Sequence, residues 1–69
     1  TKRYLIIYDI GRSDCATRQM ACRALRRMEA LKLQRSVWES GSLHDLEAVA
    51  EAISKAGGKA IVLEKKVVL

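Results

Sequence analysis

The 69-residue sequence predicts an α+β fold, in which one small antiparallel sheet carries two helices on one face. Three observations support this prediction. A continuously apolar run near the start is typical of a strand, two later stretches repeat apolar residues at helical spacing, and residues 59–69 are again largely apolar and β-branched. The elements therefore follow the order strand, helix, extended segment, helix, strand.

The first strand is expected at residues 3–10 (RYLIIYDI), because residues 4–8 are continuously apolar. Such a run is typical of a central strand that is paired on both edges and covered on at least one face. A turn at residues 11–14 follows. In this turn Ser13 is placed to cap the next helix, and Asp14 is placed near the positive end of that helix.

A helix is predicted over residues 14–30. Three of its arginines, Arg23, Arg26 and Arg27, fall on the arc opposite to the apolar stripe, whereas Arg18 lies at the edge of the stripe. The stripe itself consists of Ala21, Ala24, Leu25, Met28 and Leu31.

Residues 33–39 (LQRSVWE) are expected to be extended, either as one strand or as two short strands broken near Ser36. Ser42 and Asp45 then form a capping box, which opens a second helix that reaches about Ala56. The glycine pair at residues 57–58 ends this helix.

The last segment, residues 59–69, is predicted to be extended. Its charged triplet at residues 64–66 is a tight bend or an exposed stretch of strand, and its apolar tail at residues 67–69 is expected to fold back or to pair with another molecule's edge strand. If the middle segment supplies two strands, residues 1–69 form a single ferredoxin-like βαββαβ domain. A three-stranded parallel unit is the alternative, and it would leave little core.

The charge of the chain is uneven. There are 13 Lys and Arg against 8 Asp and Glu, a net charge of +5. Residues 1–36 carry nine basic and three acidic side chains, and residues 37–69 carry four and five, so the whole excess lies in the first half. Arginines in this setting favour phosphate, because the guanidinium fork donates two parallel hydrogen bonds to phosphate oxygens. A solvated helix face is the alternative.

Several classes of protein are excluded. No apolar run reaches the roughly 20 residues of a membrane span, and the apolar stretch after Arg3 is too short for a signal peptide. Cys15 and Cys22 fit neither a zinc site nor a disulfide framework, so we expect a reduced, cytoplasmic protein with no membrane partner. A chain of this size buries only roughly 60% of its unfolded surface. Its core is therefore very efficient or is shared with a second copy.

Asp9 is the most informative residue for chemistry. It stands at the end of a hydrophobic strand, directly before a glycine turn and a helix N-terminus. Carboxylates at such places hold hard cations such as Mg²⁺, which prefer oxygen ligands and keep several waters. Asp14 is the natural companion, and a dimer would double the number of carboxylates. The alternative is that Asp9 only caps the turn.

The strand that ends in Tyr8-Asp9-Ile10, the arginine-bearing helix after it and the segment at residues 33–39 resemble a known family. This family is the second of the two near-universal CRISPR-associated spacer-acquisition proteins, here termed the Cas two family. The combination of the Tyr-Asp-Ile strand end with a Gln-x-Ser-Val-aromatic-Glu segment some 25 residues later carries the resemblance, which covers about residues 3–40 by motif and the rest by element order.

The resemblance implies a ferredoxin-like homodimer in which two copies of the strand-end aspartate face each other and hold a divalent metal. It also implies two activities. Members act as metal-dependent endonucleases on single-stranded RNA or on duplex DNA, with activity that varies across the family. The more general role is structural: the dimer bridges two integrase dimers and helps to hold spacer DNA.

Residue by residue, the resemblance makes Asp9 the metal-binding and catalytic aspartate, and Arg18 matches an arginine early in the first helix. Ser36, Trp38 and Glu39 match the Ser-Val-aromatic-Glu segment, with Trp where Phe is usual. Two features depart from the family. A glycine commonly precedes the second strand, where this chain has Glu-Ala-Leu-Lys at residues 29–32, and the chain is shorter than usual.

We therefore expect a CRISPR-associated, dimeric nucleic-acid-binding protein of spacer acquisition, with a Mg²⁺-dependent endonuclease activity centred on paired Asp9. The arginines expected to contact the DNA or RNA backbone without reading sequence are Arg12, Arg18, Arg23, Arg26 and Arg27. A non-catalytic adaptor between the integrase and DNA is the first alternative. A toxin-type ribonuclease of the same fold is the second, and an interaction module without nucleic acid is the third.

Overall fold

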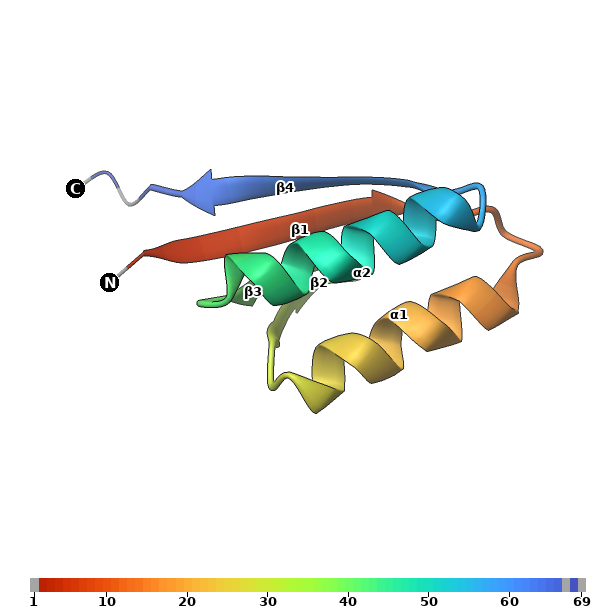
Figure 1. Ribbon diagram of the computed structural model, residues 1–69, viewed down its shortest axis with the longest axis horizontal. Coiled ribbons are helices and arrows are strands. Elements are labelled where there is room, and N and C mark those ends of the chain that lie inside the picture. Colours follow the sequence, from red (N-terminus) through yellow and green to blue (C-terminus); the bar gives the residue numbers. More distant parts are fainter. Residues whose placement is uncertain (1, 67, 69) are drawn as a thin grey trace.

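A computed structural model describes residues 2–66 and 68 of the chain, and it shows four strands and two helices in these residues (Figure 1). The elements are β1 (Arg3–Asp9), α1 (Cys15–Arg27), β2 (Leu31–Gln34), β3 (Val37–Ser40), α2 (Leu43–Lys55) and β4 (Lys59–Lys65). The strands form one antiparallel sheet in the order β2-β3-β1-β4, and both helices lie over the same face of it (Figure 1). The predicted α+β fold is thus confirmed, and the arrangement is compatible with a ferredoxin-like sandwich.

The middle segment supplies two strands, so the three-stranded parallel alternative is excluded for the described residues. The chain turns at Arg35 and Ser36, close to the predicted break. A bulge between Lys32 and Gln34 shifts the register of β2 on β3. Because β3 pairs with β1 through Ile7 opposite Val37, the turn between β2 and β3 lies beside the carboxyl end of β1.

The core lies between the helices and the face of the sheet that they cover. Alternation along β1 turns Ile6 and Tyr8 toward the helices. The indole N–H of Trp38, in β3, donates to the hydroxyl oxygen of Tyr8 at 3.1 Å, so the largest core side chain has its polar atom satisfied. The buried apolar residues are Ile6, Tyr8, Ala21, Leu25, Trp38, Leu46, Val49 and Ile53.

The two helices begin at side-chain caps. In α2 the cap is Ser42, as predicted, whose hydroxyl accepts from the backbone N–H of Asp45 at 3.3 Å. In α1 the predicted cap was wrong. Asp14, not Ser13, is the capping residue, and its carboxylate accepts from the backbone N–H of Thr17 at 3.1 Å. Hydrogen bonding by the Thr17 side chain, and next this backbone bond, lower the pKa of Asp14.

Both helices end in the same hydrogen-bonded motif, but with different residues at its left-handed position. After α2, Gly57 takes φ +96°, and Gly58 N–H donates to the carbonyl of Ile53 at 3.0 Å. After α1, Glu29 takes φ +59°, and Ala30 N–H donates to the carbonyl of Leu25 at 2.9 Å. The helix predicted to reach residue 30 therefore ends at Arg27, and Leu31 lies in β2 at 56% exposure instead of in the core stripe.

Glu29→Gly is expected to stabilise the chain by about 1 kcal/mol, because a side chain in the left-handed region costs about 1–2 kcal/mol and the greater freedom of an unfolded glycine offsets only part of that. For a domain of this size the midpoint of thermal unfolding rises by about 4–8 °C. Circular dichroism during heating measures it. Glu29→Ala removes the same charge but keeps the strained backbone, so an equal rise in that variant would contradict the explanation.

No helix among the described residues covers the second face of the sheet, and we call it the open face (Figure 1). Its apolar side chains include Leu5 and Ile7 of β1, Val37 of β3, and Ile61 and Leu63 of β4. The same alternation places Arg3, Glu39 and Lys65 on this face. Ile61 and Leu63 are 55% and 46% exposed. The charged triplet continues β4 as exposed strand through Lys65. The predicted pairing of the apolar tail at residues 67–69 lies largely outside the described residues.

Candidate nucleic-acid interface

A cleft of about 190 Å³ lies where β1 ends, and we call it the strand-end cleft. Three segments that are distant in the sequence meet there: the end of β1 with the turn after it, the first half of α1, and the turn between β2 and β3. The cleft is lined by Tyr8, Asp9, Ile10, Arg12, Arg18, Arg35 and Ser36. Two of the predicted arginines, Arg12 and Arg18, are thus brought together with Asp9.

Hydrogen bonds fix the walls of the strand-end cleft. The backbone N–H of Tyr8 donates to the carbonyl of Ser36 at 3.1 Å, which fastens the β2–β3 turn to β1. The guanidinium of Arg18 reaches back from α1 and donates to the carbonyls of Gly11 at 2.9 Å and Arg12 at 3.2 Å. Both bonds leave from one terminal nitrogen of Arg18, so its Nε–H and its other terminal nitrogen keep three donor hydrogens.

A second hollow, of about 150 Å³, adjoins the first. It shares Tyr8, Arg18, Arg35 and Ser36 with the strand-end cleft, and it adds Cys22 and Lys32. The ammonium of Lys32 lies 5.9 Å from the centre of the Trp38 ring, where the cation is attracted to the aromatic face. The basic lining therefore continues from the end of β1 to the edge strand β2.

The arginines of the strand-end cleft are free to bind an anion. Among residues 2–66 and 68, the ion pairs engage Lys2, Arg3, Lys55 and Lys65 as cations. Within those residues no carboxylate lies within 4 Å of the guanidinium of Arg12, Arg18 or Arg35. A cluster of cations that lacks internal partners raises the local potential and attracts phosphate.

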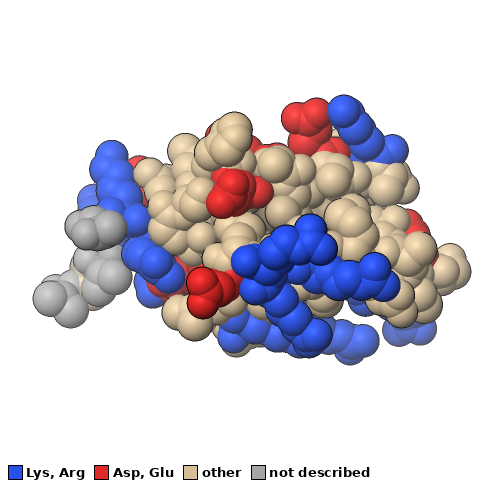
Figure 2. Space-filling view, turned by 60° about the horizontal axis from the view of Figure 1, so that its bottom comes forward, with Lys and Arg blue, Asp and Glu red and all other residues tan. Residues whose placement is uncertain are grey.

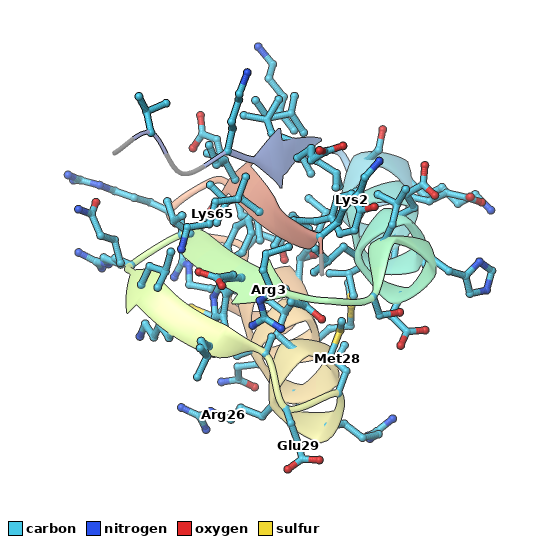
Figure 3. All side chains as sticks on the ribbon, turned by 90° about the vertical axis from the view of Figure 1, so that its left-hand side faces the viewer. Lys2, Arg3, Arg26, Met28, Glu29 and Lys65 are labelled. Atoms are coloured by element: carbon cyan, nitrogen blue, oxygen red, sulfur yellow. The ribbon has the colours of Figure 1, made fainter. Side chains whose placement is uncertain are left out.

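The remaining predicted arginines form a separate surface. Arg23, Arg26 and Arg27 are exposed on the side of α1 that faces away from the sheet, and we call these three the outer arc. Figure 2 shows basic side chains gathered over this side of the molecule, and Figure 3 shows Arg26 extending outward from α1 on the side of β2. The outer arc lies on the second half of α1, whereas Arg18 of the strand-end cleft lies on the first half, so the two are separate basic surfaces of one helix.

Asp9 is exposed, as a metal ligand must be, but no second carboxylate of the described residues lines the strand-end cleft with it. Alternation along β1 places it with Leu5 and Ile7 on the side of the open face, and it also borders the strand-end cleft. Asp14 is occupied as the cap of α1 and does not line the cleft. In the part of the chain that the structure describes, no three His, Cys, Asp or Glu side chains lie together as a metal site. One chain thus offers Mg²⁺ a single carboxylate at this place.

The segment with Ser36, Trp38 and Glu39 holds the sheet together. Glu39 is buried on β3, where its carboxylate accepts from Arg3 of β1 at 2.8 Å and from Lys65 of β4 at 3.0 Å. These two bonds lower the pKa of Glu39. Figure 3 shows Arg3 and Lys65 converging over the sheet, on the side away from the helices. Trp38 is 2% exposed, so it packs in the core and does not present its ring for base stacking.

Arg35 and Lys32 were not predicted as members of the site. Arg35 lies in the turn between two strands, and its position next to Asp9 follows only from the pairing of β3 with β1. A signal was present: once residues 33–39 are taken as two antiparallel strands broken near Ser36, the break must lie at one end of the sheet.

Comparison with known protein families, with curated proteins and with solved structures finds no match for this chain. Among the described residues, no helix is both long enough and apolar enough to cross a membrane. The strand-end cleft, the outer arc and the open face are therefore the features of this chain that bear on its function.

Proposed function

We propose that this chain is a dimeric nucleic-acid-binding protein of CRISPR spacer acquisition, similar to the Cas two family, with a Mg²⁺-dependent endonuclease activity that uses Asp9 from both copies. The observation that best supports the proposal is the strand-end cleft, which is lined by an exposed aspartate and by three arginines without carboxylate partners among the described residues. Phosphate groups of RNA or DNA satisfy such arginines, and contacts of this kind position a strand without reading its sequence.

The homodimer in this proposal is joined through the open face. Apolar side chains of β1, β3 and β4 gather there, and Ile61 and Leu63 are about half exposed in the single chain. Exposed apolar patches on small proteins mark interaction sites. A second copy is the occupant we favour because Asp9 lies at the margin of the same face, so that joining two copies there adds a second carboxylate to the first.

The residues present fit Mg²⁺ only in such a pair. Mg²⁺ is bound by one or two carboxylates, several waters and the phosphates of a substrate, which two Asp9 side chains and a nucleic acid would provide. When bound, the metal supplies a Lewis acid and a water of lowered pKa. The chain's own contributions are that Asp9 holds the ion, while Arg12, Arg18 and Arg35 bind the phosphate and neutralise its charge.

The test measures binding and cleavage separately, with Asp9→Asn beside wild type. Cleavage of single-stranded RNA and of duplex DNA is followed with Mg²⁺ and with EDTA, and affinity is followed by fluorescence anisotropy. We expect Asp9→Asn to lose Mg²⁺-dependent cleavage, on the order of 100-fold or more, and to bind within about threefold of wild type, because phosphate contacts supply most of the affinity. Asp45→Asn, which removes an exposed carboxylate at the start of α2, is the matched control and should cleave as wild type does.

The outcomes separate the alternatives. Cleavage that persists in Asp9→Asn contradicts the proposed catalytic site. Binding without cleavage in wild type contradicts the nuclease and favours the adaptor, which needs phosphate contacts and the integrase but no metal. Affinity that does not fall between about 50 and about 200 mM salt contradicts nucleic-acid binding through phosphates altogether.

A further inference from the structure

We propose that the strand-end cleft is a seat for one phosphate group, formed by Arg12, Arg18 and Arg35 and distinct in role from the outer arc. This inference deepens the proposed function and rests on it in naming a nucleic acid as the source of the phosphate. The phosphate comes either from the end of a strand or from an internal position of its backbone, and the experiment below distinguishes these two sources.

The size of the cleft selects a group and not a whole small molecule. Sites for small-molecule ligands occupy about 300–1,000 Å³, whereas the strand-end cleft has about 190 Å³. A cleft of this size can bind one charged group of a larger ligand, while the rest of the ligand lies outside the cleft. The neighbouring hollow of about 150 Å³ lets the rest of a chain continue past Arg18 and Arg35 toward Lys32.

The charge of the lining favours phosphate. Three guanidinium groups and the carboxylate of Asp9 give the cleft a formal charge of about +2 when all four are ionised. A terminal phosphate carries about −1.5 to −2 at neutral pH, so the charges are matched. A carboxylate or chloride ion has fewer oxygens or none, and would leave part of the donor set unsatisfied.

One of the three guanidinium groups, that of Arg18, is also held in place before a ligand arrives. Arg18 is fastened by its bonds to the carbonyls of Gly11 and Arg12, and the backbone around Arg35 is fastened through Ser36 to β1. A preorganised guanidinium loses less freedom on binding than one on an open helix face. The guanidinium groups of the outer arc donate no such hydrogen bonds to other described residues, so their contacts with phosphate are expected to be weaker and less saturable.

The experiment is a titration of the ¹⁵N-labelled protein with inorganic phosphate at constant ionic strength, read from the Nε–H signals of the arginines. We expect the signals of Arg18 and Arg35 to shift in a saturable manner and that of Arg26 to shift little. Arg35→Gln should raise the apparent dissociation constant for phosphate about tenfold or more, because it removes a charged donor fork. Arg26→Gln removes the same charge from the outer arc and should change the apparent dissociation constant for phosphate by less than about twofold.

A second arm compares short single-stranded oligonucleotides with and without a 5′-phosphate. Tighter binding of the phosphorylated strand, lost in Arg35→Gln, supports the proposal with the strand end as the source. Equal binding of both strands, weakened more in Arg35→Gln than in Arg26→Gln, supports it with the backbone as the source.

Each remaining outcome is decisive. Shifts that do not saturate, or that Arg26→Gln reduces as much as Arg35→Gln does, overturn the phosphate seat. If oligonucleotides still bind in that case, the proposed function survives without it. If phosphate saturates the cleft but no oligonucleotide binds, the seat stands and the proposed function fails.

Discussion

Replacing Trp38 by alanine is expected to lower the free energy of unfolding by about 3–5 kcal/mol. Trp38 is the only tryptophan, it is 2% exposed, and it is the largest of the fully buried side chains. Truncating a core tryptophan costs about 3–5 kcal/mol. At about 0.05–0.15 kcal/mol per residue, a chain of this length has only about 3–10 kcal/mol of stability in total. The truncation therefore removes a third or more of the stability, and at the lower end all of it.

The measurement is urea denaturation followed by far-ultraviolet circular dichroism, since the variant has no tryptophan fluorescence. If Trp38→Ala proves unfolded from the start, milder variants retain the information. Trp38→Phe keeps a ring but lacks the N–H that donates to Tyr8, and Tyr8→Phe leaves that N–H without its acceptor.

Each single change is expected to cost about 1–3 kcal/mol, and the double variant is expected to cost less than the sum, because removing both partners leaves no unsatisfied group. If the free-energy costs of Trp38→Phe and Tyr8→Phe simply add in the double variant, the hydrogen bond between these two side chains does not stabilise the fold. If Trp38→Ala is as stable as wild type, the packing of Trp38 in the core does not stabilise it either.

The order of elements could be predicted because each has a strong local signal. The apolar run of β1, the capping box at Ser42 and the glycine after α2 act through near neighbours in the chain. The end of α1 could not be predicted in the same way. The helical spacing of apolar residues continues through Met28 to Leu31. The left-handed position after a helix is usually occupied by Gly or Asn, so a Glu at position 29 does not predict it. The chain reverses there because the end of α1 and β2 must return to the sheet, which is a tertiary requirement.

In the candidate site, too, some features follow from local sequence signals and others depend on tertiary structure. Asp9 could be singled out from its place between a strand and a glycine turn, and Arg12 and Arg18 from the uneven charge. The split of the arginines into a cleft and an outer arc depends on which flank of α1 meets the β2–β3 turn. That is decided by the register of β3 on β1, and a one-residue difference in register would turn the opposite face of the strand inward.

Replacing Ile61 by glutamate is expected to convert the proposed dimer into a monomer. Ile61 lies opposite Ile7 in the open face and is 55% exposed in the single chain, so a charge there is tolerated in the monomer within about 0.5 kcal/mol. In a dimer joined through this face, both copies would bury that charge without a partner. Burying an unpaired charge costs several kcal/mol, which corresponds to a rise in the dissociation constant of more than about 100-fold.

Sedimentation velocity across a range of protein concentrations measures this shift, and Leu43→Glu is the matched control. Leu43 is also apolar and 38% exposed, but it begins α2 on the covered side of the sheet, where a negative charge near a helix N-terminus is favourable. Leu43→Glu should therefore sediment as wild type does. A dimer that survives Ile61→Glu and dissociates in Leu43→Glu would place the interface on the helices. In that case the two Asp9 side chains would not meet through the open face, and the paired metal site would lose its structural basis even if each chain still bound phosphate.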